Sequence, residues 1–187
     1  GKRFWIVGSG GSIACYDVVE RRRFDYSYPE ELTSTWEGIA VSGERGSEKA
    51  LTANGSGEVL PFAVDGTDPD WGHLDRVAQP GATVDALGST PDGVGFAVDT
   101  NGRAHRTTPE GGWTSVGVLD TRASFTDIDA GPDEQVYVTA DDGRIYRYGN
   151  TYHSWTPIEV GEGVAIRTVD VFRGRNGRRQ MTALSEN

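Results

Sequence analysis

The sequence is short of several residue types, and each shortage excludes something. Cys15 is the single cysteine among 187 residues, so no disulfide can form within the chain. Only Lys2 and Lys49 are lysines, although Lys and Arg together number 18. No apolar run approaches the roughly 20 residues that a membrane-spanning helix needs. We therefore expect neither a disulfide-stabilised fold nor a membrane protein.

Basic charge is scarce relative to acidic charge. The formal net charge is −10, from 28 acidic and 18 basic residues. Such a surface repels a phosphate backbone and an anionic membrane face, so we expect no nucleic-acid partner and no membrane partner. Excess carboxylate with little lysine is typical of halophilic proteins, in which salt screens the repulsion. An acidic protein from a GC-rich genome is the other interpretation.

The usual signatures of catalysis are missing as well. The stretch Gly8-Ser9-Gly10-Gly11 lies between two expected strands, whereas a phosphate-binding loop opens a helix. The three histidines show no metal-ligand spacing. We therefore predict no catalytic residues and no resident cofactor. No signal peptide is visible, which favours a cytoplasmic location, and we expect a monomer or a weak oligomer.

What the sequence does contain is a repeat. Glycines in hairpin-type dipeptides recur at Gly11, Gly57, Gly102 and Gly143, at intervals of 46, 45 and 41 residues. Gly-Gly, Asn-Gly and Asp-Gly pairs tolerate the positive φ angles of tight hairpins. The clearest unit begins at Thr126 and has four expected strands, which cover 127–130, 135–139, 144–148 and the surroundings of Trp155. Four antiparallel strands at a period of about 40–50 residues are typical of a β-propeller blade.

We therefore predict an all-β fold, a single β-propeller domain of four-stranded antiparallel blades. The units cover approximately residues 1–36, 37–80, 81–123, 124–165 and 166–187. They supply three, four, four, four and two strands, so about four to five blades are visible. The incomplete first and last units favour a portion of a longer propeller, and a closed four-bladed ring is the alternative. Pro61 cannot donate to a ladder, which favours a strand end or an exposed edge for it.

One unit carries a family resemblance. The segments 143–147, 154–158 and 166–171 (Gly-Arg-Ile-Tyr-Arg, Ser-Trp-Thr-Pro-Ile and Ile-Arg-Thr-Val-Asp-Val) resemble a blade of the Asp-box, or BNR-repeat, propellers. That group includes sialidases and sortilin-type receptors. With its acidic, lysine-poor composition, the chain also resembles uncharacterised haloarchaeal propellers. The resemblance to the haloarchaeal proteins implies a fold and no activity.

Aspartates recur on the expected first strands. Asp85, Asp129 and Asp170 occupy what we take as one repeat position, with Ala40 at the matching place in the second unit. First strands line the central channel of a propeller, so these carboxylates are candidate ligands of a divalent cation. Hydrogen bonds to backbone amides or channel water are the alternative.

Ligand-binding candidates come from the two long loops that depart from the repeat, 28–36 and 65–71. They are Trp36, Asp68 and Asp70. By contrast Trp71, Trp113 and Trp155 recur at intervals of 42 residues. Equal spacing favours one packing position used in every blade over a surface for stacking sugars.

These observations favour a non-catalytic binding or scaffold module, with an unknown protein or small molecule bound on one face or in the channel mouth. The alternative is a glycan-cleaving hydrolase of sialidase-like type. It requires arginines that converge with a tyrosine and a carboxylate. The chain supplies these residue types in Arg103, Arg144, Arg147, Arg167, Tyr146 and Glu159.

Overall fold

The protein is built from antiparallel sheets. The computed structural model describes residues 3–28, 35–66, 68–119, 122–131, 134–149, 154–160, 164–173 and 179–185, and in them five sheets occur. Within these ranges no helix is long and apolar enough to cross a membrane. The all-β class and the four-stranded antiparallel sheets predicted from the sequence are confirmed.

The strands follow the chain in order, sheet by sheet. The first sheet holds β1 (Arg3–Val7), β2 (Ile13–Asp17) and β3 (Arg22–Asp25). The second holds β4 (Trp36–Glu44), β5 (Ser47–Asn54), β6 (Glu58–Asp65), β7 (Asp68–Trp71) and β8 (Asp75–Arg76). The third holds β9 (Val84–Ser89), β10 (Gly95–Asp99), β11 (Arg103–Thr107) and β12 (Trp113–Val118). The fourth holds β13 (Phe125–Gly131), β14 (Gln135–Ala140), β15 (Arg144–Gly149) and β16 (Ser154–Glu159). The fifth holds β17 (Ile166–Arg173) and β18 (Arg179–Ser185).

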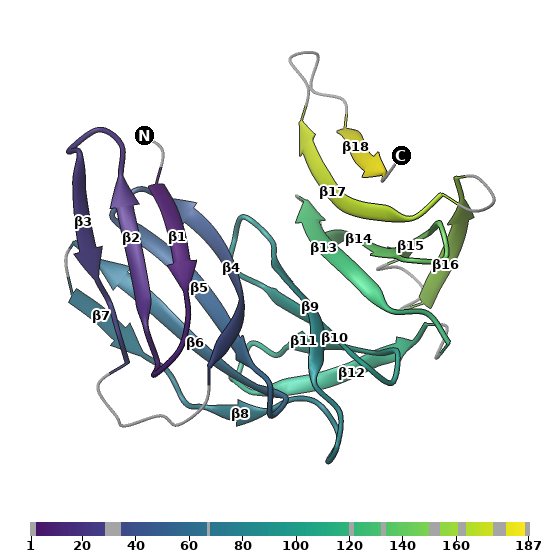
Figure 1. The fold of residues 1–187 in the computed structure, drawn as a ribbon, viewed down its shortest axis with the longest axis horizontal. Helices are drawn as coiled ribbons and strands as arrows, with labels where there is room; N and C mark the ends of the chain where they lie inside the picture. Colours follow the sequence, from purple (N-terminus) through teal and green to yellow (C-terminus); the bar gives the residue numbers. More distant parts are fainter. Residues whose placement is uncertain are drawn as a thin grey trace.

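The sheets succeed one another around an arc, with the first and fifth at its two ends (Figure 1). The first strands of successive sheets contact each other, β4 with β9, β9 with β13, and β13 with β17. The outer strands β3, β7, β12 and β16 lie farthest from them (Figure 1). This radial arrangement is that of propeller blades.

The hairpin glycines lie where the repeat predicts them. Gly11, Gly57, Gly102 and Gly143 have φ angles of 72°, 76°, 73° and 83°. A side chain on Cβ disfavours this left-handed region, so glycine is the residue that closes these turns without strain.

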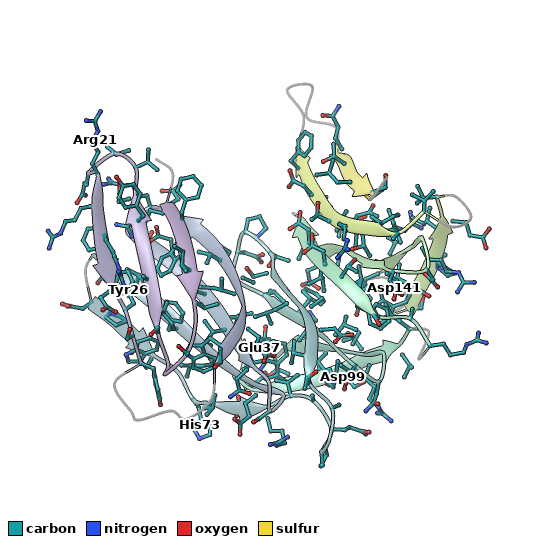
Figure 2. All side chains as sticks on the ribbon, viewed as in Figure 1. Arg21, Tyr26, Glu37, His73, Asp99 and Asp141 are labelled. Carbon is teal, nitrogen blue, oxygen red and sulfur yellow. The ribbon has the colours of Figure 1, made fainter. Side chains whose placement is uncertain are left out.

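The hydrophobic core is divided among the contacts between sheets, which we call seams. Trp5, Tyr26 and Phe62 pack between the first and second sheets, with the Trp5 and Tyr26 rings stacked 5.2 Å apart. A second cluster joins the second and third sheets, and a third cluster joins the third and fourth. Figure 2 shows Tyr26 inside the first of these seams, whereas Arg21 extends outward from the β2–β3 turn. The first four sheets are therefore stabilised chiefly by apolar contacts with the sheets beside them.

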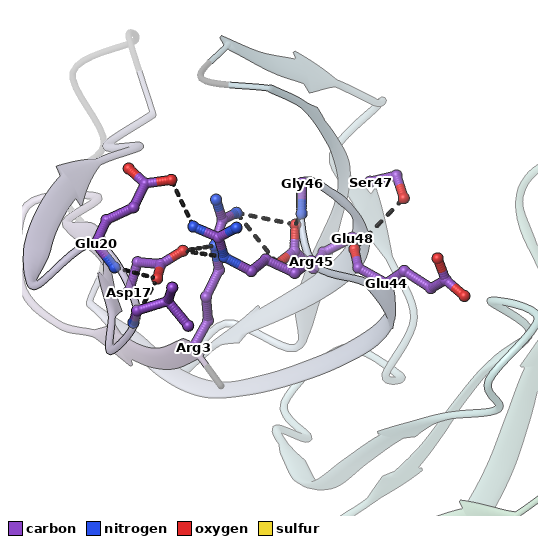
Figure 3. Close-up of polar contacts among 9 residues, drawn as sticks. Arg3, Asp17, Glu20, Glu44, Arg45, Gly46, Ser47 and Glu48 are labelled. Atoms are coloured by element: carbon purple, nitrogen blue, oxygen red, sulfur yellow. Dashed lines mark hydrogen bonds and ion pairs between the residues drawn. The ribbon is translucent and has the colours of Figure 1, made fainter. Parts of the chain in front are cut away.

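The seam between the first and second sheets also contains a charged cluster (Figure 3). Asp17, which is 0% exposed, accepts hydrogen bonds at Oδ2 from Arg3 Nε at 2.9 Å and from Arg45 Nε at 2.6 Å. Arg3 also reaches Glu48 at 3.0 Å, and Arg45 reaches Glu20 at 2.5 Å. The hydrogen bond from Arg45 is the chief reason why the pKa of Asp17 lies well below its ordinary value. The cluster ties β1 and β2 to the β4–β5 hairpin.

Pro61 is not at a strand end, because it lies in the middle of β6 and pairs with Leu51. On its other side the partner of β6 changes from β7 to β8, and Pro61 falls in the gap between them. A residue without an N–H is tolerated where no partner strand runs alongside. The sequence did not predict β8. Two further prolines, Pro69 and Pro157, lie on the outer strands β7 and β16.

Candidate functional site

The aspartates of the first strands do not share one repeat position. Asp129 pairs with Tyr137, and the residue at the matching position in the third sheet is Gly88, which pairs with Phe96. Asp85 lies three residues earlier, beside a β-bulge at Val98 and Asp99. The local likeness of Val-Asp-Ala to Ile-Asp-Ala therefore misled the alignment, because the two tripeptides lie three residues apart in cross-strand register.

The inner carboxylates bond to backbone amides of the next sheet. Asp127 Oδ2 accepts the N–H of Val169 at 2.9 Å, and Asp129 Oδ2 accepts that of Val171 at 2.5 Å. Asp85 Oδ2 accepts the N–H of Phe125 at 3.3 Å. We call Asp85, Asp127 and Asp129 the seam carboxylates. Burial is the main reason that their pKa values are raised.

The proposed metal ligands are not brought together. Asp170 is exposed on β17, while the oxygens of Asp129 and Asp85 bond to amides. In the part of the chain that the structure describes, no group of three His, Cys, Asp or Glu side chains could hold a metal ion. A divalent cation at this channel stays a prediction from the sequence.

The loop candidates separate into three environments. Trp36 is 2% exposed and packs in the core, so it is not presented to a ligand. Asp68 is exposed at the start of β7. Asp70 lines a groove at the seam between the second and third sheets. Of the first loop, residues 29–34 lie outside the described residues.

The repeating tryptophans pack against the preceding sheet. Trp155 Nε1 donates to the carbonyl of Val116 at 3.1 Å, across the seam between the fourth and third sheets. Trp71 meets the ring of Tyr28, which follows the first sheet, at 5.1 Å. Trp113 belongs partly to the cluster that includes Leu51 of the second sheet. Each ring thus faces the sheet before its own.

The groove at the second seam has a volume of about 380 Å³. Its floor begins with a row of residues that pair across three strands, Lys49 with Ala63 and Ala63 with Asp70. Directly paired residues point to the same face of a sheet, so Lys49 and Asp70 flank the small side chain of Ala63. Both charged residues are exposed.

The next rows of the floor are apolar and then acidic. Leu51 pairs with Pro61, and the N–H of Gly72 donates to the Pro61 carbonyl at 2.8 Å. Asp75 on β8 pairs with Val59 in the row beyond. Gly72 lies against Pro61, because a Cβ on this glycine would be only 2.7 Å from Pro61 Cγ.

The third sheet supplies the opposite wall. Thr107 and Trp113 line it, together with Gly93 in the turn before β10. A Cβ on Gly93 would lie 2.6 Å from Lys49 Cδ, so the lysine stem runs across the seam over this glycine. Glycine at this position leaves room for the lysine to reach the third sheet.

The charges of the groove are mostly uncompensated. No ion pair involves Lys49 or Asp70 within the described ranges. Asp75 accepts from His73 Nδ1 at 3.1 Å when that nitrogen is protonated, and His73 projects at the rim near β8 (Figure 2). The groove thus offers a cation at one end and two carboxylates at the other.

A smaller cavity of about 180 Å³ lies where β4, β9 and β13 meet, and Asp127 and Asp129 line it. Their carboxylates already bond to β17, so this cavity offers fewer unsatisfied groups than the seam groove.

The residue types of a sialidase site lie on several strands. Arg103 is on β11, Arg144 is on β15 beside Asp142, and Glu159 is on β16. The side chain of Tyr146 is only 5% exposed and packs within the third core cluster. It is therefore not placed to attack a ligand at the surface.

Comparison with known proteins establishes the fold. A virginiamycin B lyase from Staphylococcus aureus is similar with a TM-score of 0.65 and 11% identity, over 92% of this chain and 63% of that one. Sqt1 of Saccharomyces cerevisiae is similar with a TM-score of 0.72 and 10% identity, over 98% of this chain and 52% of that one. The WD40 repeats of RRP9 are similar with a TM-score of 0.71 and 13% identity, over 89% of this chain and 50% of that one. No protein-family model and no curated protein matches the sequence.

The chain is thus a β-propeller by likeness to solved structures, and identities this low show the fold alone. It spans between 50% and 63% of the lengths of these three chains. The activity, substrates and partners of those proteins are not carried over by this likeness.

Sequence reasoning found Asp70 but missed Lys49 and Asp75. Lys49 carried a signal, since it is one of only two lysines in the chain. Asp75 carried none, because its place depends on the unexpected strand β8.

Proposed function

We propose that the protein is a non-catalytic binding module that holds a small ligand in the groove between the second and third sheets. The observation that carries this proposal is a groove flanked by Lys49 and Asp70, two exposed charges of opposite sign without ion-pair partners in the described chain. Its volume of about 380 Å³ lies within the range of small-molecule sites, about 300–1,000 Å³. Rigid sheets on both sides support a preformed site.

The side chains of the groove favour recognition over chemistry. Among the described residues that line it, the hydroxyls of Ser42, Ser89 and Thr107 have no histidine beside them. The hydroxyl of Ser42, which is paired with Lys49, donates to the Lys49 backbone carbonyl at 3.4 Å and not to a side-chain base. The buried Tyr146 likewise gives no support to the sialidase-like alternative.

Finer assignments belong to the same proposal and rest on the sequence. The segments 143–147, 154–158 and 166–171 support kinship with Asp-box propellers. The net charge of −10 and the two lysines support a halophilic source, and a cytoplasmic location stays an expectation from the sequence. An unknown protein or small molecule remains the partner class, with the chain as a monomer or weak oligomer.

A groove-filling variant tests the function. Ala63→Trp places a large side chain on the groove floor, and binding detected by ligand-observed NMR against a panel of amino acids, short peptides, sugars and nucleotides should be lost. Ala14→Trp is the matched control, because Ala14 is also half-buried on a strand paired on both sides, β2, but lies in the first sheet. It should leave binding unchanged. Hits that survive Ala63→Trp, or no hits in the panel, would contradict the proposal.

A further inference from the structure

The charges of the seam groove are segregated by strand. Lys49 on β5 is its one cationic lining residue among those described, whereas Asp70 on β7 and Asp75 on β8 are its anionic ones. A ligand with only negative charge is repelled by the two carboxylates, and one with only positive charge is repelled by Lys49. Charge complementarity therefore favours a ligand that is itself bipolar.

We propose that the ligand is a short peptide with free termini, whose carboxylate pairs with Lys49 and whose ammonium group pairs with Asp70 on the anionic side of the groove. This inference rests on the proposed function and specifies the ligand class of the same groove. A neutral sugar would fill the space but would leave the opposing charges without partners.

The separation of the strands that carry Lys49 and Asp70 guides the length of the peptide. Lys49, Ala63 and Asp70 lie in one row on three consecutive strands. Adjacent strands are about 4.8 Å apart, so the backbones of Lys49 and Asp70 are about 10 Å apart. An extended residue spans about 3.4 Å, which makes peptides of about two to three residues the best match.

Gly72 packs against Pro61 on the anionic side of the groove. A Cβ on this residue would lie 2.7 Å from Pro61 Cγ and 2.9 Å from the Pro61 carbonyl oxygen, so no side chain fits there. Asp70 and Asp75 lie on either side of this contact, opposite Ala63 and Val59. An ammonium group with three N–H donors can form a charge-assisted hydrogen bond with Asp70, and Asp75 adds negative charge to the same side of the groove.

The middle of the groove suits an apolar side chain. Leu51, Pro61 and Ala63 form its floor, and Trp113 of the third sheet stands opposite. An aromatic side chain of the peptide would bury its area against Trp113 and Pro61. Gly-Gly-Phe is therefore a suitable probe, with a free ammonium group, a free carboxylate and one ring.

Capping the termini of the probe tests the charge pairing directly. Isothermal titration should detect Gly-Gly-Phe, and both N-acetyl-Gly-Gly-Phe and Gly-Gly-Phe-amide should bind about tenfold more weakly or worse, since each has lost one charge-assisted contact. A peptide of six residues should also bind more weakly, because its termini cannot meet both ends of the groove.

Paired changes in protein and probe show which residue meets which terminus. Lys49→Met should weaken Gly-Gly-Phe about tenfold but leave the affinity for Gly-Gly-Phe-amide near that of the unaltered protein. Asp70→Asn should likewise weaken Gly-Gly-Phe about tenfold but leave the affinity for N-acetyl-Gly-Gly-Phe near that of the unaltered protein. Asp68→Asn is the control, because Asp68 lies on the same strand outside the groove, and it should change nothing.

The outcomes separate the ligand class from the function. If a neutral sugar or a capped peptide binds as well as Gly-Gly-Phe and Ala63→Trp abolishes that binding, the peptide proposal is overturned and the binding groove stands. The peptide proposal is also overturned, and the binding groove stands, if Gly-Gly-Phe does not bind but another panel member binds and loses its binding in Ala63→Trp. If Gly-Gly-Phe binds equally to Ala63→Trp, or if nothing binds at all, both proposals fail.

Discussion

The carboxylate of Asp127 accepts a hydrogen bond from the backbone N–H of Val169 at 2.9 Å, across the seam between the fourth and fifth sheets. The first strands of neighbouring sheets form no shared ladder. A side chain on one strand therefore bonds to an amide on the next that would otherwise lack a partner there. Asp129 and Asp85 make equivalent contacts, so polar bonds reinforce the apolar packing of two seams.

Removal of this contact should loosen the fifth sheet. Asp127→Ala leaves the Val169 N–H without its acceptor, and we expect a loss of about 1–3 kcal/mol in unfolding free energy. Hydrogen exchange at Val169 should accelerate more than exchange at Val138 in the fourth sheet. Asp170→Ala is the control, since Asp170 is exposed on β17, and it should change stability by less than about 0.5 kcal/mol. Equal effects of the two variants would contradict the role of Asp127.

The seam carboxylates should also give a distinctive pH dependence. Burial raises the pKa values of Asp127 and Asp129 above about 3.9, the value in an unfolded chain. The folded state then binds more protons, so their contribution is fully present below about pH 4 and is lost as pH rises through the raised values. In the double variant Asp127→Asn, Asp129→Asn this loss is absent. Its stability relative to the unaltered protein, measured by urea unfolding, should improve from about pH 4 upward, and a difference independent of pH would refute the assignment.

Two glycines with similar backbone conformations should respond differently to a methyl group. Gly57 has φ 76°, and a Cβ there would lie 2.6 Å from the Ala78 Cβ and 2.7 Å from the Ala82 carbonyl oxygen. Gly66 has φ 69° with nothing within 4 Å. Gly57→Ala should therefore cost about 1–3 kcal/mol more than Gly66→Ala, because only the first adds overpacking to backbone strain. Thermal or urea unfolding of both variants measures this difference, and equal losses would mean that the close approach at Gly57 relaxes freely.

Salt should stabilise the folded protein. With a net charge of −10, repulsion among carboxylates opposes the compact state, and molar KCl shortens the screening length to about 3 Å. The melting temperature should rise between low and molar salt, and most of the rise should come before about 1 M. A melting temperature that stays flat over this range would remove the argument for a halophilic source.

The repeat could be predicted from the sequence because its signals are local. The turns at Gly102 and Gly143 need positive φ angles, and dipeptides such as Asn-Gly predict such turns. The groove could not be predicted, because Lys49 and Asp70 come to flank Ala63 only through cross-strand register. The place of Asp75 depends on β8 and on the break in pairing at Pro61, and neither has a sequence signature. The misplacement of Asp85 has a related cause, since only the pairing partners show that Gly88 matches Asp129.

Prolines on the outer strands bear on how molecules of this protein meet one another. Pro69 on β7 and Pro157 on β16 lie on the last strands of their ladders. A strand from another molecule that approached either edge would find one donor missing from the row it must pair with. Growth of one sheet into the next, the first step toward fibrils, is thereby interrupted at two of the outer edges, even when the molecules are crowded and salt has screened their mutual repulsion.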